Sequence, residues 1–292
     1  MTDASNSLRK QLADTSAPLV VPGGGTPLEA LAAEQAGFGA FYLSGYSIAA
    51  WRHGLPDIGL LGAGEMVGAL DAVARVSGVP IIADADTGYG DATSVHSTVR
   101  LFEAHGASGI QIEDQVWPKK CGHMVGKEVI DGDEAVRRVA TAVEARRDPS
   151  TVIIARTDSL APLGLDEAIR RATRFSEVGA DVVFVDAPRS EAELARVGSE
   201  VPGTLMANMS EGGSTPLLSA TQFHAHGFQL VIYPTTALRV ASLGFEQFFA
   251  DLRSSGDSTP WRSRMHGLDE LNKLVDLEGY LSVGDRSGEV KV

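Results

Sequence analysis

The chain of 292 residues has little of several features that mark other classes of protein. It contains one cysteine, which excludes an internal disulfide and suits a reducing cytoplasm, where we expect the protein. Acidic residues outnumber basic ones, 38 to 25, which argues against nucleic acid or an anionic membrane as the partner. No apolar run approaches the length of a membrane span, and residues 1–17 contain no apolar signal-peptide core.

Long apolar runs are missing, but short ones recur along the chain. They consist mostly of consecutive Val, Ile, Leu and Phe, as expected for parallel strands that are buried on both faces. The eight runs cover residues 19–21, 40–43, 79–83, 109–113, 152–156, 182–186, 205–207 and 230–233. Stretches with helical periodicity separate them, at residues 27–36, 63–76, 94–105, 133–147, 165–178, 191–200 and 216–226.

This alternation of strands and helices predicts βαβ units around a parallel sheet. Eight such units favour an α/β fold of the (β/α)8 TIM-barrel type, with a doubly wound open sheet as the alternative. No Pro- or Ser-rich linker divides the chain, so we expect one barrel domain over residues 1–292, preceded by an N-terminal arm at 1–17.

The C-terminal part, residues 235–292, contains more helix than one barrel unit needs. Residues 235–254 have the pattern of an amphipathic helix that carries Phe245, Phe248 and Phe249, and residues 260–282 suggest further helix. We expect these segments to pack outside the barrel against a neighbouring subunit. The alternative is that they cap their own barrel.

Polar residues follow the predicted strands at the end of a barrel where catalytic groups gather. Asp84 and Asp86 follow the third strand, and Glu113 ends the fourth. Three carboxylates in one cleft repel one another unless they are protonated or bind a cation. A hard divalent ion such as Mg²⁺ resolves this repulsion. The alternative for each Asp alone is an N-cap of the next helix.

Other strand ends carry groups suited to an anion. Arg156 follows four apolar residues and either pairs with a structural carboxylate or holds a carboxylate of the substrate. Ser44, Gly45, Asn208 and Ser210 offer hydroxyl, amide and backbone N–H donors for carboxylate oxygens. Ordinary turn chemistry is the alternative for each of these residues.

The single cysteine, Cys121, stands between Lys119-Lys120 and Gly122-His123. Nearby cations lower the pKa of a thiol, so Cys121 is a candidate for proton transfer or nucleophilic attack. An inert buried thiol is the alternative. Two lysines, a glycine and a histidine are poor neighbours for a core residue, and this favours the chemical role.

Together these residues carry a family pattern. The matching motifs are residues 42–45 (YLSG), 54–57 (GLPD), 84–90 (DADTGYG), 113–115 (EDQ), 119–123 (KKCGH), 155–158 (ARTD) and 207–216 (ANMSEGGSTP). The chain resembles the isocitrate lyase/phosphoenolpyruvate mutase superfamily over roughly residues 17–250. The KKCGH loop is the most specific of the motifs.

The resemblance implies a (β/α)8 barrel whose eighth helix swaps between the subunits of a homotetramer. It also implies Mg²⁺, with Mn²⁺ as a possible substitute, near Asp84, Asp86 and Glu113. It implies a catalytic role for Cys121, with support from Lys120, His123 and Arg156. The substrate-binding positions that it implies are Ser44, Gly45, Tyr46, Asp57, Gly122, Arg156, Asp186, Asn208, Ser210, Ser214 and Thr215.

Within the superfamily, the chain looks most like the short bacterial enzymes of the 2-methylisocitrate lyase, 2,3-dimethylmalate lyase and carboxyphosphonoenolpyruvate phosphonomutase type. We therefore expect a Mg²⁺-dependent carbon–carbon lyase that acts on a small di- or tricarboxylate. Phosphonomutase-type P–C chemistry and oxaloacetate hydrolase-type cleavage are the alternatives. Asp186 stands where many of the lyases have Glu, and Tyr46 and Trp51 replace smaller residues.

Overall fold

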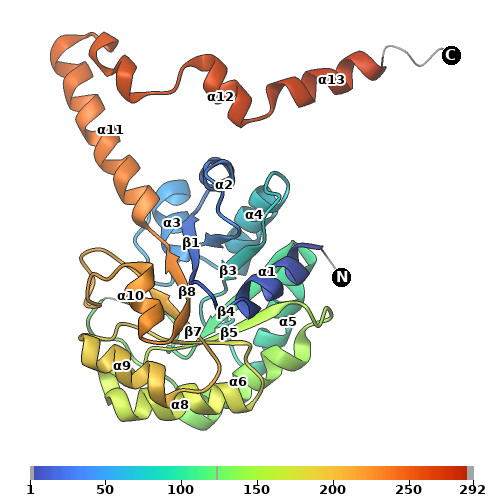
Figure 1. Ribbon diagram of the computed structural model, residues 1–292, viewed down its shortest axis with the longest axis vertical. Coiled ribbons are helices and arrows are strands. Elements are labelled where there is room, and N and C mark those ends of the chain that lie inside the picture. Colours follow the sequence, from blue (N-terminus) through green and yellow to red (C-terminus); the bar gives the residue numbers. More distant parts are fainter. Residues whose placement is uncertain (1–2, 123, 288–292) are drawn as a thin grey trace. The chain divides into compact units, whose positions relative to one another are not determined.

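In the computed structural model, which describes residues 3–122 and 124–287, eight parallel strands close into a barrel in chain order (Figure 1). The strands are β1 (Leu19–Gly24), β2 (Phe41–Leu43), β3 (Ile81–Asp84), β4 (Ala107–Glu113), β5 (Val152–Thr157), β6 (Val182–Val185), β7 (Thr204–Asn208) and β8 (Phe228–Tyr233). Each predicted strand is confirmed. Since β1 pairs with both β2 and β8, the alternative of an open sheet is wrong.

Helices surround the barrel between successive strands. They are α2 (Pro27–Gln35), α3 (Gly45–Ser47), η1 (Ile48–Arg52), α4 (Ala63–Ala74), α5 (Ala92–Ala104), α6 (Gly132–Ala145), α7 (Leu160–Leu163), α8 (Leu165–Glu177), α9 (Glu191–Glu200) and α10 (Ala220–Ala225). The predicted helix at 216–226 is shorter than expected, because it begins only after its N-cap, Ser219, whose hydroxyl accepts a hydrogen bond from the Gln222 N–H.

The strand periodicity explains why the pocket forms at the carboxyl end of the barrel. Side chains two residues apart point to the same face of a strand. Buried Ile82 and Ile154 lie in one apolar cluster inside the barrel, and the next residues on the same face are Asp84 and Arg156. The inward face of these strands therefore changes from apolar to polar side chains over two residues.

The N-terminal arm of the sequence prediction contains a helix, α1 (Asp3–Ala13), that closes the amino-terminal end of the barrel. Its Leu8 is fully buried in the cluster inside the barrel, where Gly109 of β4 leaves it room. The Arg9 guanidinium donates to the carbonyls of Ser150 and Thr151, just before β5. The helix thus plugs the end of the barrel opposite the polar strand ends.

The described residues from 238 to 287 form a second compact unit. It contains most of α11 (Thr236–Ser255), then η2 (Thr259–Arg264), α12 (Leu268–Leu274) and α13 (Leu277–Ser287). Trp261 packs edge-on against Phe248, with ring centroids 5.5 Å apart, and donates from Nε1 to Asp251. The helix predicted at 260–282 is interrupted, because Met265 is extended and Asp276 adopts a left-handed conformation.

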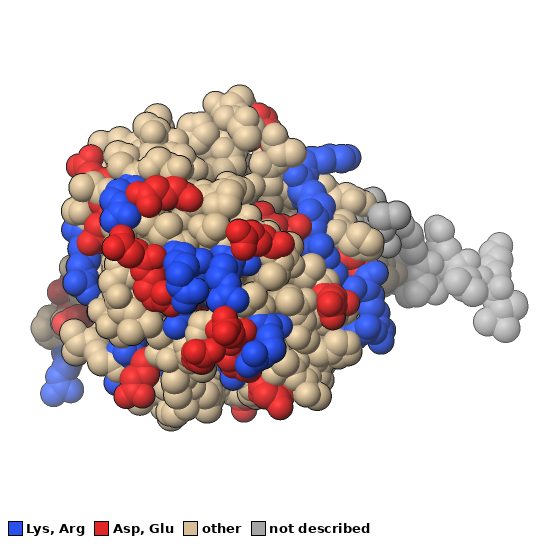
Figure 2. Space-filling model, turned by 90° about the horizontal axis from the view of Figure 1, so that it is seen from below, with Lys and Arg blue, Asp and Glu red and all other residues tan. Residues whose placement is uncertain are grey.

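Charged side chains of both signs mix on the outer helices. Ion pairs join Arg137 to Glu134, Arg170 to Glu167 and Arg196 to Glu200. Figure 2 looks at the molecule from the side on which Figure 1 draws α8 and α9, and it shows basic groups beside acidic ones. None of the helices in residues 3–122 and 124–287 combines the length and the apolar composition that a membrane span requires.

The burial of Leu8 leads to a stability prediction. We expect Leu8→Ala to lower the free energy of unfolding by about 2–5 kcal/mol, because it leaves a cavity where α1 seals the barrel. Urea denaturation measures the change. Lys10→Ala is the matched control on the exposed side of the same helix and should cost less than about 0.5 kcal/mol. Equal effects of the two substitutions would contradict the sealing role of α1.

Candidate active site

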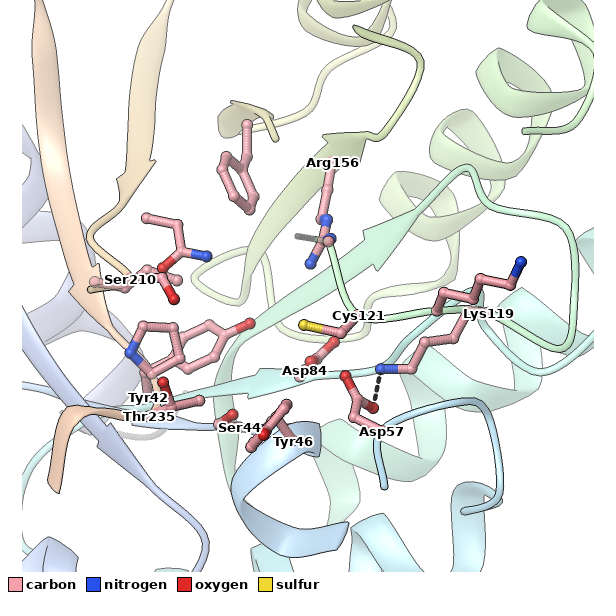
Figure 3. A pocket seen from close by; sticks show the side chains of 16 residues that line it. Tyr42, Ser44, Tyr46, Asp57, Asp84, Lys119, Cys121, Arg156, Ser210 and Thr235 are labelled. Atoms are coloured by element: carbon pink, nitrogen blue, oxygen red, sulfur yellow. Dashed lines mark hydrogen bonds and ion pairs between the residues drawn. The ribbon is translucent and has the colours of Figure 1, made fainter. Parts of the chain in front are cut away.

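A pocket opens at the carboxyl ends of the strands, and several elements supply its walls (Figure 3). It is lined by Tyr42, Ser44, Tyr46, Asp57, Asp84, Lys119, Lys120, Cys121, Gly122, Arg156, Phe184, Asn208, Ser210, Ile232, Pro234 and Thr235. The floor is apolar and consists of barrel residues such as Phe184 and Ile232. The walls are polar and contain both acids and cations.

The three predicted metal carboxylates are buried at the ends of β3 and β4. Asp84 lines the pocket, and its Oδ1 accepts from the backbone N–H of Asp86 at 3.1 Å. Burial raises the pKa of Asp86 to about 6, and the charge of Asp84 contributes to the rise. Burial also raises the pKa of Glu113 well above its usual range. Burial therefore disfavours the charged form of both acids.

Lys119 supplies one of the balancing cations, a role that the sequence analysis did not assign to it. Its side chain is buried, with Nζ 2.5 Å from Asp57 and 2.9 Å from Asp86. Burial alone would lower the pKa of Lys119, but the carboxylates of Asp86 and Asp57 raise it well above its ordinary value. Asp57, predicted to bind substrate, lies on the pocket wall and holds this lysine.

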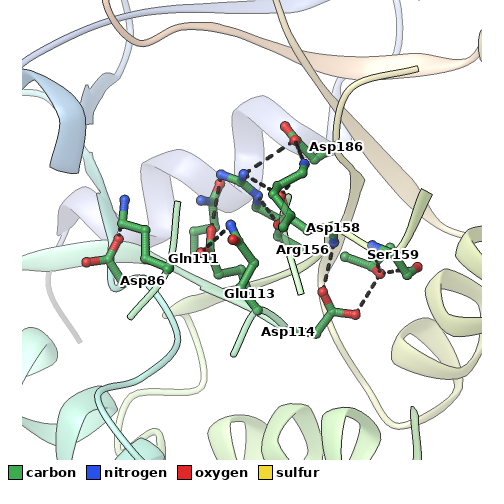
Figure 4. A network of polar contacts seen from close by, with 12 residues as sticks. Asp86, Gln111, Glu113, Asp114, Arg156, Asp158, Ser159 and Asp186 are labelled. Carbon is green, nitrogen blue, oxygen red and sulfur yellow. Dashed lines mark hydrogen bonds and ion pairs between the residues drawn. The ribbon is translucent and has the colours of Figure 1, made fainter. Parts of the chain in front are cut away.

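Arg156 reaches the pocket from β5 within a ring of acids (Figure 4). Its Nε and Nη2 donate to the two carboxylate oxygens of Asp158, at 2.8 and 2.9 Å. Its Nη1 lies 3.2 Å from Glu113, and its Nη2 lies 3.5 Å from Asp186. Arg156 is thus paired with a buried carboxylate and also lines the pocket, and its binding of a substrate carboxylate stays a prediction.

A second layer of buried polar residues lies behind Arg156 and the acids that surround it. Asp114 accepts from the Thr157 hydroxyl at 2.7 Å and from the backbone N–H of Asp158 at 2.8 Å. Arg171 of α8 donates to the same Asp114 carboxylate at 2.9 Å and to the carbonyl of Ile130. These contacts fix the backbone at the end of β5, and with it the direction of the Arg156 side chain.

Cys121 lies on the loop after β4, and its sulfur points into the space that Tyr42, Asp84 and Arg156 also face (Figure 3). The Cys121 backbone N–H donates to the carbonyl of Asp57 at 3.2 Å. Gly122 lies so close to Asp186 and Arg156 that a Cβ there would collide with both side chains. The absence of a side chain at Gly122 therefore allows the loop backbone to pack against Asp186 and Arg156.

The other two predicted loop residues have different outcomes. Lys120 contributes to the pocket wall, but its Nζ donates to the Gly126 carbonyl at 2.6 Å on the exposed side of the loop. His123 lies outside the described residues. Of the two adjacent lysines, Lys119 is the one that enters the charged centre.

The structure brings most of the predicted substrate-binding residues to this pocket. Ser44, Tyr46, Asn208 and Ser210 line it, and Gly45 places its backbone against the Asp84 carboxylate. Within the described chain, four predicted substrate-binding residues, Gly45 and three others, are not among the lining residues. Asp186 lies behind Arg156, Thr215 is buried, and Ser214 is exposed after β7.

Sequence reasoning missed several residues of the site. Tyr42, Phe184 and Ile232 form apolar parts of the pocket, and their strand periodicity already placed them inside the barrel. Asp158 follows Arg156 at a spacing of two residues, which was a signal for a shared face. Lys127, whose buried Nζ contacts Asp158 and Asp186 behind the pocket, was missed as well. Its position in an irregular loop gave no periodicity from which burial could be read.

The residues present fit a magnesium ion. A Cβ on Gly45 would lie 3.2 Å from Asp84 Oδ2 and 3.6 Å from Asp86 Oδ1, so both acids face Gly45, and Asp86 Oδ1 is also paired with Lys119. Among residues 3–122 and 124–287, no three acidic, His or Cys side chains form a ready-made metal cluster. Mg²⁺ needs only one or two direct carboxylates, since water completes its coordination, and its ligands are oxygen atoms.

A (β/α)8 barrel with a charged pocket at its carboxyl end is the architecture of an enzyme. The chain matches the family model described as phosphoenolpyruvate phosphomutase over residues 8–253. It therefore belongs to the phosphoenolpyruvate mutase/isocitrate lyase superfamily, and the sequence resemblance is confirmed.

Similar proteins cover nearly the whole chain. A 2,3-dimethylmalate lyase of Eubacterium barkeri is 40% identical over 269 residues, which are 92% of this chain and 93% of the relative. A probable 2-methylisocitrate lyase of Corynebacterium glutamicum is 44% identical, over 89% of this chain and 85% of the relative. The crystal structure of a 2,3-dimethylmalate lyase superposes with a TM-score of 0.92 at 33% identity, covering 100% of this chain and 99% of the other.

The position of Gly122 generates a prediction about the loop. We expect Gly122→Ala to fold normally but to lower turnover by ~10²-fold, since the added methyl group lifts the loop and misplaces its groups. Steady-state kinetics and melting temperature measure the two effects. Gly68→Ala is the control, because Gly68 lies on the exposed side of α4 with open space at its Cβ. Wild-type turnover in Gly122→Ala would contradict the tight contact.

Proposed function

We propose that the protein is a Mg²⁺-dependent carbon–carbon lyase. It cleaves a substituted malate or isocitrate-like acid, of the 2,3-dimethylmalate or 2-methylisocitrate type, into an α-oxo acid and a second carboxylic acid. The observation that carries the proposal is one pocket that joins a thiol, a guanidinium and carboxylates suited to a hard cation. Similarity to lyases at about 40% identity over nine-tenths of the chain supports it.

The reaction assigns a role to each group. As the carbon–carbon bond breaks, the substrate hydroxyl passes its proton to a carboxylate of the pocket and becomes the carbonyl of the α-oxo product, and the bonding pair passes to the departing carbon. Arg156 binds the carboxylate of the α-oxo fragment, with Ser44 as a further donor. Cys121 delivers a proton to the departing carbon. Mg²⁺ held at Asp84, with Asp86 and Glu113 behind it, would stabilise the developing negative oxygen.

The apolar part of the pocket supports an alkyl-substituted substrate. Tyr42, Phe184 and Ile232 present aromatic and aliphatic surface beside the charged groups. A methyl group gains free energy when it leaves water for such a surface. Tyr46, 38% exposed, narrows the entrance, so we expect small substituents such as methyl rather than long chains.

Phosphonomutase-type chemistry is the second candidate, because the superfamily includes P–C enzymes. The crystal structure of a phosphonopyruvate hydrolase with oxalate and Mg²⁺ superposes with a TM-score of 0.88 at 30% identity, covering 98% of this chain and 99% of the other. The charge of this pocket favours the lyase. Its buried cations, Lys119 and Arg156, already face carboxylates, and a phosphonate would bring more negative charge than a second carboxylate does.

We propose a homotetramer in which the C-terminal helices pack against a neighbouring subunit. Leu268, Tyr280 and Val283 are 81, 71 and 66% exposed in the single chain, and α12 has no buried residue. Exposed apolar side chains that lie together commonly become covered when subunits associate. The swapped eighth helix stays a prediction of the family resemblance.

Activity assays with candidate acids test the proposal. We expect 2,3-dimethylmalate or 2-methylisocitrate to release pyruvate, EDTA to abolish the reaction, and Mg²⁺ or Mn²⁺ to restore it. Asp86→Ala should stay folded and lose the response to metal, because it removes an oxygen from the cation site. Full activity in chelator would contradict the metal role. Phosphonopyruvate turnover without cleavage of either acid would favour the second candidate.

The role of Cys121 has its own test. We expect Cys121→Ala to keep its melting temperature and its binding of oxalate with Mg²⁺, and to lose ~10²-fold or more in turnover, the usual contribution of one acid–base group. Iodoacetamide should inactivate the wild type, and oxalate with Mg²⁺ should protect it. A destabilised Cys121→Ala with normal turnover would instead assign the thiol to packing.

A further inference from the structure

Lys127, at the far end of the loop that carries Cys121, makes a compact set of contacts with the acids around Arg156. Its Nζ lies 2.7 Å from Asp158 Oδ1 and 2.8 Å from Asp186 Oδ2. Nη2 of Arg156 approaches the same two oxygens, at 2.9 Å from Asp158 Oδ1 and 3.5 Å from Asp186 Oδ2. The four atoms form a closed square in which positive and negative groups alternate.

The square is buried and asymmetric. The side chains of Lys127, Asp158 and Asp186 are at most 1% exposed. On the Lys127 side both contacts are hydrogen bonds, but on the Arg156 side only the contact to Asp158 is short. The Arg156 guanidinium is therefore aligned with Asp158 and stands off from Asp186.

We propose that Lys127 is a positioning residue that holds the Arg156 guanidinium in its anion-binding direction by neutralising Asp186. The inference rests on the proposed function, in which Arg156 binds the carboxylate of the α-oxo fragment.

Electrostatics in a buried site gives the physical reason. Buried charges interact strongly, and a carboxylate that loses its cation attracts the nearest remaining one. Without Lys127, Asp186 would lose a partner at 2.8 Å, and among the described residues Nη2 of Arg156 already lies 3.5 Å from the same oxygen. The guanidinium would turn toward Asp186 and give up its bidentate alignment with Asp158. A rotated guanidinium would no longer present its donors to a ligand in the pocket.

The loop that carries Cys121 meets these four charged groups at two places. Gly122 packs against Asp186 and Nη2 of Arg156, and Lys127 follows the loop after Gly126. A shift of the guanidinium toward Asp186 would therefore also move it toward the Gly122 backbone. The anion site and the seat of the loop depend on one balance of charge.

Three variants test the proposal: Lys127→Met, Asp186→Asn and the double variant. We expect Lys127→Met to bind oxalate, with saturating Mg²⁺, ~10-fold or more weakly by calorimetry, the scale of one charge-assisted hydrogen bond. The double variant removes both charges, and it should bind oxalate within about threefold of Asp186→Asn. Lys10→Met, on the exposed side of α1, should leave the affinity unchanged.

A crystal structure of Lys127→Met provides a readout that is independent of any ligand. We expect the Arg156 guanidinium to lie within hydrogen-bond distance of Asp186. An unmoved guanidinium would overturn the proposal, as would wild-type oxalate affinity in Lys127→Met. Binding in the double variant as weak as in Lys127→Met and more than threefold weaker than in Asp186→Asn would also overturn it, because Lys127 would then act through packing rather than charge.

If Lys127→Met fails to fold, the double variant still decides the question. Oxalate binding like that of Asp186→Asn would support the charge balance, and its loss would refute it. If the wild type binds no oxalate with Mg²⁺, the proposed function fails, while the position of the guanidinium in the variant structures still tests the role of Lys127.

Discussion

The site depends on one constraint: Arg156 is a charged group at the end of a buried strand, and it needs anions around it. Asp158 meets the planar guanidinium with both oxygens, and this bidentate contact fixes its orientation. Glu113 and Asp186 then bring further negative charge, which Lys127 partly neutralises. The geometry of the pocket follows from how these charges pair, because Arg156 and its three acids lie on or next to barrel strands that cannot shift independently.

The loop after β4 connects this charged centre to Cys121. Its backbone rests on Asp186 and Arg156 through Gly122, and Lys119, two residues before Cys121, is fixed by Asp57 and Asp86. The thiol therefore lies between two anchors, one on each side of the pocket. An ion or an anion that changed the charge at either anchor would therefore act on the position of the thiol.

Much of the fold could be predicted from the sequence, because continuous apolar runs between helical patterns specify a parallel barrel. Asp84 and Arg156 could be placed at the pocket, since each follows such a run. Which of two adjacent lysines turns inward could not be predicted, because the loop has no period, and Lys119 rather than Lys120 enters the centre. Helix α1 was missed as a helix although Leu8 and Leu12 lie four residues apart, since the rest of the segment is polar.

Asp186 links these observations to specificity. Many of the lyases that the chain resembles have the longer Glu at this position. The structure indicates why the shorter acid matters here. Asp186 Oδ2 contacts Lys127 Nζ, and it lies so close to Gly122 that a Cβ on that residue would collide with it. A longer acid would extend toward the loop or displace the lysine, and either change would alter the balance that orients Arg156. The length of this one side chain therefore bears on both the seat of Gly122 and the direction of the Arg156 guanidinium, although it stands behind the pocket wall.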